Sequence, residues 1–218
     1  MGVRRLGDTA PDFKADTTKG PIEFHKWKEG SWAILFSHPA DFTPVCTTEL
    51  GQVAKLSSEW EKRHIKVIGL STNGLDDHEQ WINDINETQS SNVQFPIIAD
   101  KDRNVAVLYD MLDHQDATNV DSKGVPFTVR SVFIVDPKNV IRLILTYPAS
   151  CGRNFHEILR TVDSLQLSDT KRVTTPAGWN SLQDEVIIHP GVSNEEAEKM
   201  FPGYKTLKPY LRMTKLPA

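Results

Sequence analysis

The chain has 218 residues, of which 39% are hydrophobic and 25% are charged, and its formal net charge is −4. These values are typical of a globular protein with enough chain for a packed core. They give no electrostatic reason to expect nucleic acid as a partner, and no apolar run reaches the roughly 20 residues that a transmembrane helix needs.

Apolar periodicity and turn-forming residues predict strands and helices in alternation. Residues 16–24 predict a hairpin with its turn at Gly20 and Pro21. The elements that follow are strand 32–37, helix 45–63, strand 65–71, helix 75–85, strand 95–99, helix 105–109, strands 131–136 and 140–147 joined by a turn, and helix 155–165. Alternating elements that end in a hairpin and a helix predict an α/β fold with a mixed sheet.

Cys46 lies at the start of the helix predicted over residues 45–63, directly after a loop with two prolines. The first-turn N–H groups of a helix have no partner inside it, and the helix dipole is positive there, so this position favours a thiolate over a thiol. The alternative is a buried, inert cysteine.

Pro39, Thr43 and Cys46 are spaced as P-x-x-x-T-x-x-C within the string HPADFTPVCTTE. This string resembles the active-site motif of the peroxiredoxins, and in particular their one-cysteine, peroxiredoxin-6 type. The resemblance extends from the APDF string at residues 10–13 to the C-terminal region. It implies the thioredoxin-like fold for the mixed sheet and the role of peroxidatic nucleophile for Cys46.

Two further residues of the motif have both a functional and a structural interpretation. The Thr43 hydroxyl can donate and accept, so it can hold the thiolate or the peroxide; the alternative is an ordinary helix cap. Pro39 has no N–H and can shape and dry the pocket; the alternative is a simple turn residue.

Arg130, in the string VRSVFIVD, matches the active-site arginine of the family. An arginine here can stabilise the thiolate and polarise the O–O bond; the alternative is a surface salt bridge. Glu49, one turn past Cys46, is expected to orient an arginine. Arg153, in CGRNF, also matches a family position and is expected behind the first arginine, and His38 is expected to line the pocket.

The chain contains two cysteines, Cys46 and Cys151, and no C-x-x-C pair, so neither a disulfide scaffold nor a thioredoxin-type dithiol is expected. Two-cysteine peroxiredoxins carry a resolving cysteine in a V-C-P-A-G-W stretch, where this chain has Thr175. The resemblance therefore implies reduction by an external thiol, such as glutathione or thioredoxin. Cys151 is the single internal alternative and is interpreted as a bystander.

From about residue 168 the chain becomes rich in proline and glycine, and about 50 residues are too few to bury a sufficient core alone. We therefore expect a thioredoxin-like peroxidase domain over residues 1–167 and a C-terminal domain over residues 168–218. The C-terminal domain is expected to pack on the first domain or on a second copy of the chain. The resemblance implies that it makes the contacts of a homodimer.

The predicted function is the reduction of hydrogen peroxide and organic hydroperoxides through Cys46, in antioxidant defence and redox homeostasis. One alternative is a redox sensor or chaperone-like protein that relays oxidation to partners. Another is a phospholipase with Ser31 as its nucleophile, but neither flanking glycine of G-x-S-x-G is present.

The sequence predicts neither a metal nor a cofactor. It contains no H-x-x-H or H-E-x-x-H pair and no glycine-rich nucleotide loop. The first residues lack the apolar core of a signal peptide, so we expect a cytoplasmic location; the alternative is an organelle, if a transit peptide has been removed.

Overall fold

The structure is a computed structural model, and it describes residues 3–216. Two compact units make up the chain, residues 1–155 and residues 156–218. The boundary expected between residues 167 and 168 falls inside helix α6 (Phe155–Lys171). No helix within residues 3–216 combines the length and the apolar character that crossing a bilayer requires.

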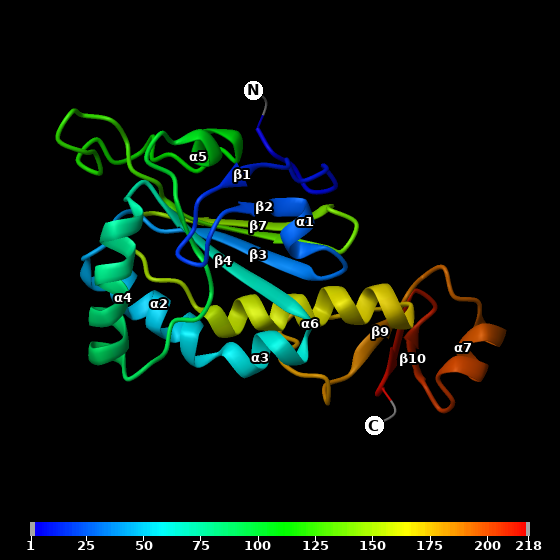
Figure 1. Ribbon diagram of the computed structural model, residues 1–218. Helices are drawn as coiled ribbons and strands as arrows, with labels where there is room; N and C mark the ends of the chain where they lie inside the picture. The colour runs from blue at the N-terminus through cyan, green and yellow to red at the C-terminus, as the bar shows by residue number, and fades with distance from the viewer. Residues whose placement is uncertain (1–2, 217–218) are drawn as a thin grey trace. The chain divides into compact units, whose positions relative to one another are not determined.

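The first unit is built on a five-stranded sheet with the order β5-β4-β3-β6-β7 (Figure 1). Strands β3, β4 and β5 are parallel, whereas β6 and β7 run antiparallel to their neighbours. The mixed sheet predicted from the sequence is thus confirmed. The strands are β3 (Trp32–Ser37), β4 (Ile65–Ser71), β5 (Ile97–Ala99), β6 (Arg130–Val135) and β7 (Ile141–Tyr147).

Strand β3 lies at the centre of the sheet, and all six of its residues are buried. Its neighbours are β4 on one side, with Phe36 opposite Gly69, and β6 on the other, with Phe36 opposite Val132. A strand covered on both faces needs apolar side chains at successive positions, which explains the unbroken run from Trp32 to Phe36. The C-terminal end of this rigid strand leads directly into the loop before Cys46.

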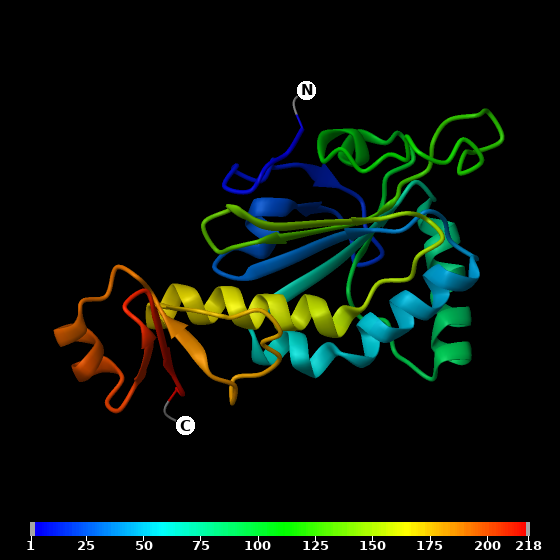
Figure 2. The same ribbon diagram turned by 180° about the vertical axis from the view of Figure 1, so that it is seen from behind.

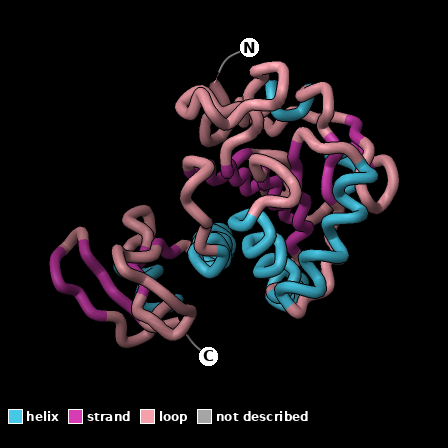
Figure 3. Tube along the Cα trace, turned by 90° about the vertical axis from the view of Figure 1, so that its left-hand side faces the viewer, coloured by secondary structure: helices cyan, strands magenta, loops and turns pink. Residues whose placement is uncertain are grey.

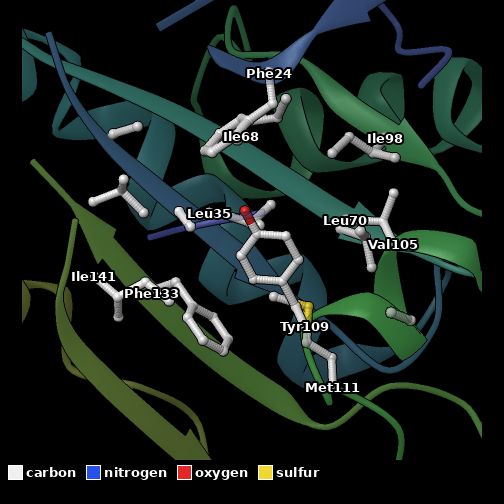
Figure 4. Close-up of a cluster of buried hydrophobic side chains, with 14 residues drawn as sticks. Phe24, Leu35, Ile68, Leu70, Ile98, Val105, Tyr109, Met111, Phe133 and Ile141 are labelled. Atoms are coloured by element: carbon white, nitrogen blue, oxygen red, sulfur yellow. The ribbon is translucent and has the colours of Figure 1, made fainter. Parts of the chain in front are cut away.

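A hydrophobic core fills one face of the sheet (Figure 4). Leu35, Ile68 and Phe133 point into it from three adjacent strands, and Tyr109 packs edge-on against Phe133. Figures 1 and 2 show a hairpin and two short helices over this face. They are β1 (Lys14–Ala15), β2 (Ile22–Glu23), α1 (Phe24–Lys28) and α5 (Asn104–Leu108).

The opposite face of the sheet carries the longer helices of the first unit, α2 (Pro44–Lys55), α3 (Ser57–Lys62) and α4 (Leu75–Gln89). The single helix predicted over residues 45–63 is wrong, because the chain breaks at Leu56 into α2 and α3. At the break, the Val53 carbonyl accepts from the Leu56 N–H at 3.3 Å, three residues on, and from the Trp60 indole N–H at 2.9 Å. A tertiary hydrogen bond of this kind is not visible in apolar periodicity.

The second unit combines α6 with a four-stranded sheet of order β10-β11-β9-β8 (Figure 3). Its own small core contains Trp179, Val186 and Phe201. Helix α6 is longer than the segment predicted over residues 155–165. The other elements are β8 (Val173–Thr174), β9 (Val186–Ile188), α7 (Asn194–Met200), β10 (Lys205–Lys208) and β11 (Leu211–Thr214).

Candidate active site

Cys46 occupies the first turn of α2 and is fully buried. Pro44 begins this helix, where its missing N–H costs nothing and its fixed φ favours the helical conformation. Thr43 precedes it with an extended backbone. Cys46 therefore lies in the first turn, at the positive end of the helix dipole, as the sequence predicted.

Arg130, the first residue of β6, brings its guanidinium to this sulfur. Its Nη1 lies 3.3 Å from Cys46 Sγ and donates to Glu49 Oε2 at 2.7 Å. Its Nε and Nη2 both donate to the Ala149 carbonyl, at 2.8 and 2.6 Å. The side chain is only 3% exposed, so the alternative of a surface salt bridge does not describe it. Three fixed donors hold the positive charge beside the sulfur in one orientation.

Glu49 lies between Arg130 and a second buried arginine, Arg153. Arg153 donates to Glu49 Oε1 from its backbone N at 2.7 Å and from Nε at 2.9 Å, and to Oε2 from Nη2 at 2.8 Å. Burial by itself raises the pKa of Glu49, but the hydrogen bonds and charge of Arg153, with Arg130, outweigh it and lower that pKa. Glu49 is therefore an anion that orients both arginines.

Arg153 is also enclosed by aromatic rings. Its guanidinium carbon lies 5.2 Å from the ring centre of Phe36 and 5.4 Å from that of Phe155. Stacking of this kind suits a planar guanidinium and keeps water away. Its Nη1 donates to the Ser131 carbonyl at 2.9 Å, which ties it to β6 directly after Arg130. Arg153 therefore supports the site by holding Glu49 and the start of β6.

His38 and Pro39, at the end of β3, are both buried. His38 Nε2 lies 2.8 Å from Asp41 Oδ1, and His78 Nδ1 is hydrogen-bonded to the other oxygen of Asp41. Burial by itself raises the pKa of Asp41, but the two histidines lower it to about 2. Asp41 and His78 were not identified from the sequence, because nothing in a single chain shows that residues 37 positions apart meet.

Thr43 is half-buried at the start of α2, and its side chain makes no capping hydrogen bond to the helix. Its hydroxyl instead donates to the Ala40 carbonyl at 2.8 Å. Thr43 is therefore the N-cap residue of α2 by position, without the side-chain hydrogen bond that a threonine cap usually makes. With its proton directed at Ala40, the oxygen keeps lone pairs for a further contact in the loop.

Cys46 and Cys151 are both free thiols, one buried and one exposed. Cys151 follows Ala149, whose carbonyl holds Arg130, and its own sulfur lies 3.9 Å from the Gly152 carbonyl. Thr175, at the position of a resolving cysteine, is hydrogen-bonded to Ser164 at 2.6 Å. Among residues 3–216, no three His, Cys, Asp or Glu side chains gather in a way that would hold a metal ion.

A buried thiol at a helix start, contacted by a fixed arginine donor, is suited to attack an electrophilic oxygen while the arginine stabilises negative charge on the departing one. On a mixed sheet of this topology, the arrangement defines the class of thiol-dependent peroxidases with a thioredoxin-like fold.

The comparison with known proteins gives the same result. A family model described as the AhpC/TSA family matches residues 6–144. The chain is 53% identical over 212 residues to mitochondrial peroxiredoxin PRX1 of Saccharomyces cerevisiae, covering 97% of this chain and 80% of that protein. The chain belongs to the AhpC/TSA family and is a peroxiredoxin of the one-cysteine, peroxiredoxin-6 type.

Two solved structures agree with this assignment over nearly the whole chain. A cysteine-to-serine mutant of peroxiredoxin 6 of Arenicola marina has 44% identity and a TM-score of 0.93, covering 98% of this chain and 99% of that one. A yeast mitochondrial 1-Cys peroxiredoxin has 51% identity and a TM-score of 0.88, covering 98% and 100%. The protein is therefore a thiol-dependent peroxidase, and the interpretation as a non-enzymatic sensor is not supported.

Proposed function

We propose that Cys46 is the peroxidatic cysteine and that the chain needs an external thiol to complete its cycle. In the first step, the Cys46 thiolate attacks one oxygen of ROOH and the O–O bond breaks. With one proton taken up, the products are the Cys46 sulfenic acid and ROH. The 3.3 Å contact between Arg130 Nη1 and Cys46 Sγ carries this proposal, because it places a fixed cation where the leaving oxygen gains charge.

Each of the other site residues receives a role from its contacts. Arg130 stabilises the thiolate and the departing oxygen, Glu49 holds Arg130, and Arg153 holds Glu49. The half-buried Thr43 hydroxyl, whose proton is donated to Ala40, keeps lone pairs that can accept a hydrogen bond from the peroxide. Pro39 is buried and lines the site without presenting an N–H donor. His38, which is also buried, is proposed to line the site.

The external reductant is proposed from the placement of the cysteines. Cys46 is buried and Cys151 is exposed, and position 175, where a two-cysteine enzyme resolves, is a threonine. A thiol R′SH then attacks the sulfenic acid and releases water, and a second thiol releases R′SSR″ and restores Cys46. The related yeast 1-Cys peroxiredoxin is resolved via glutathione and thioredoxin systems, which makes these two thiols the first candidates here.

Single-turnover and steady-state kinetics test this cycle. The reduced chain should consume one equivalent of hydroperoxide with no reductant, and it should turn over many equivalents with glutathione or with thioredoxin and its reductase. Sustained turnover of many equivalents without any added thiol would contradict the proposal, whereas one further equivalent is what oxidation of the sulfenic acid to the sulfinic acid consumes.

A homodimer is proposed on the basis of the sheet edge and the resemblance. Strand β7 pairs with β6 on one side and lies at the end of the sheet order in the first unit. Its first residue, Ile141, pairs with residues 7 and 8, and the rest of this edge is a surface that proteins commonly cover with a second copy. Sedimentation velocity would give a dimer mass at micromolar concentration, whereas a monomer mass there would contradict this assignment.

We also propose a cytoplasmic location, in keeping with the two free thiols of the chain. The related yeast protein PRX1 is mitochondrial, so the experiment must distinguish a cytoplasmic location from a mitochondrial one. Cell fractionation with compartment markers decides between them.

A further inference from the structure

Arg130 begins β6 at a place where this strand is no longer paired with β3. The last register pair between the two strands joins Phe36 to Val132, so the ladder on this side stops two residues short of Arg130. On the other side, the ladder with β7 extends to Arg130, which pairs with Tyr147. The backbone that carries the arginine is therefore held by other groups on the β3 side.

The Ser37 side chain supplies this attachment. Its Oγ donates to the Val129 carbonyl at 2.6 Å and accepts from the Ser131 N–H at 3.1 Å, so one oxygen holds both neighbours of Arg130. Ser37 is fully buried, and it is the last residue of β3. Because a carbonyl only accepts and an amide N–H only donates, the hydroxyl hydrogen must point to Val129, and the orientation of the hydroxyl is fixed.

A second hydroxyl joins the same two segments. Thr128 Oγ1 donates to the main-chain carbonyl of His38 at 2.6 Å, and Thr128 is also fully buried. Residues 37–38 and 128–131 are thus connected by three hydrogen bonds, each through a side-chain oxygen. An apolar residue at position 37 or 128 would leave buried backbone groups without these partners, which is costly.

These hydrogen bonds lie at the base of both segments that carry the reacting groups. The chain runs from Ser37 through the loop to Cys46 in the first turn of α2, and Arg130 lies between the two residues that Ser37 holds. At the other end of its side chain, Arg130 reaches Cys46 Sγ. The guanidinium is thus fixed by its own contacts, and the backbone behind it is fixed by β7 on one side and by Ser37 on the other.

We propose that Ser37, supported by Thr128, is a positioning residue for peroxide reduction, because its hydroxyl holds the backbone of Arg130 where the guanidinium reaches the peroxidatic sulfur. This inference rests on the proposed function of Arg130 in the first oxidation. Ser37 acts through Arg130 and is assigned no contact with the peroxide. A displacement of about 1 Å in a reacting group can lower a rate by roughly a hundredfold, so a backbone attachment at this point has a measurable effect.

Two reactions of Cys46, measured in each variant, test this role. The first is oxidation by hydrogen peroxide in a single turnover, and the second is alkylation by iodoacetamide, quantified on the Cys46 peptide by mass spectrometry. Arg130 stabilises the thiolate in both reactions, but an oxygen departs with negative charge only in the first. The ratio of the oxidation rate to the alkylation rate therefore reports how well Arg130 is placed for the departing oxygen.

Ser37→Ala should lower this ratio by about tenfold, the change that corresponds to the loss of about one hydrogen bond. Added to Arg130→Ala, it should change the ratio by less than about twofold, because the residue through which it acts is then absent. A decrease of the same size in both backgrounds would show that Ser37→Ala merely opens the site to the alkylating reagent, and it would overturn the proposal.

Thr17→Val is the matched control, because it removes a hydroxyl with the same two kinds of hydrogen bond. Thr17 is 3% exposed and lies between β1 and β2, and its Oγ1 donates to the Gly20 carbonyl at 2.7 Å and accepts from the Lys19 N–H at 3.1 Å. The ratio for Thr17→Val should stay within about twofold of wild type. A decrease equal to that of Ser37→Ala would overturn the proposal, since any lost buried hydroxyl would then have this effect.

The Arg130→Ala measurement separates the two levels of the argument. If Arg130→Ala lowers the ratio and Ser37→Ala does not, the proposed peroxidase step stands and the role of Ser37 is overturned. If Ser37→Ala does not fold, Thr128→Val takes its place, because it removes the hydrogen bond to His38 at nearly constant volume. Thr128→Val should then lower the ratio by about threefold or more, and an unchanged ratio would overturn the proposal.

Discussion

Arg130 Nη1 lies 3.3 Å from Cys46 Sγ, although 84 residues separate the two in the sequence. Cys46 comes from the start of α2 and Arg130 from the start of β6, so the contact depends on the pairing of β3 with β6. The same Nη1 donates to Glu49 one turn further along α2. The sulfur, the cation and the anion are thus fixed on two rigid elements, which is how a site is preorganised for charge development.

Cysteine substitutions separate the peroxidatic thiol from the exposed one. Cys46→Ser should abolish peroxide consumption, because the hydroxyl of serine does not ionise near pH 7. Cys151→Ser should keep consumption within about twofold of wild type, since its sulfur is exposed and its weak contact is with the Gly152 carbonyl at 3.9 Å. Peroxide loss measured with a coupled thiol assay checks both. Lost turnover with an intact first oxidation in Cys151→Ser would contradict the one-cysteine cycle.

Arg130→Ala should slow the first oxidation by more than thiolate loss explains. An ordinary thiol with a pKa of about 8.5 is roughly 3% ionised at pH 7, so full ionisation can gain at most about thirtyfold. A loss well above thirtyfold in stopped-flow fluorescence would therefore include lost stabilisation of the departing oxygen. Arg63→Ala, which breaks a pair with Glu59 on α3, is the control and should leave the rate unchanged. A smaller effect of Arg130→Ala would remove its proposed role on the O–O bond.

Glu49→Gln should destabilise the fold, because it leaves Arg130 and Arg153 buried without their shared anion. Breaking a buried pair in this way lowers the free energy of unfolding by about 3–5 kcal/mol. The free energy of unfolding in urea checks this, with Glu59→Gln as the half-buried control and a much smaller loss expected there. Equal effects of the two substitutions would mean that the buried carboxylate has no special role.

Asp41 makes stability depend on pH in the acid range. Its folded-state pKa of about 2 lies below the ordinary value of 3.8, so its contribution is fully present above about pH 4 and is lost as the pH falls towards 2. The contribution is about 2 kcal/mol. The difference in unfolding free energy between wild type and Asp41→Asn should therefore shrink between pH 5 and pH 3 in urea titrations. A difference that stayed constant across that range would show that the carboxylate is not the titrating group.

Sequence patterns predicted the parts of the site that lie within one local motif or match a family position. Cys46 was found from the strand, loop and helix signals around it, and Arg130 and Arg153 from short strings that match the family. Asp41 and His78 were missed because their pairing needs the packing of α4 against α2, which no local pattern encodes. The break at Leu56 is not predicted for a similar reason, since it involves a hydrogen bond from the Trp60 indole N–H to the Val53 carbonyl.

In the cycle proposed for this chain, Cys46 alone reacts with peroxide and no internal thiol resolves it. Intact mass after one equivalent of hydrogen peroxide, with a sulfenic-acid trap present, tests this most directly. We predict a single trap adduct on Cys46, because Arg130 contacts this sulfur and not that of the exposed Cys151. A loss of two hydrogens with no adduct would instead show a disulfide between the two cysteines and contradict the one-cysteine cycle.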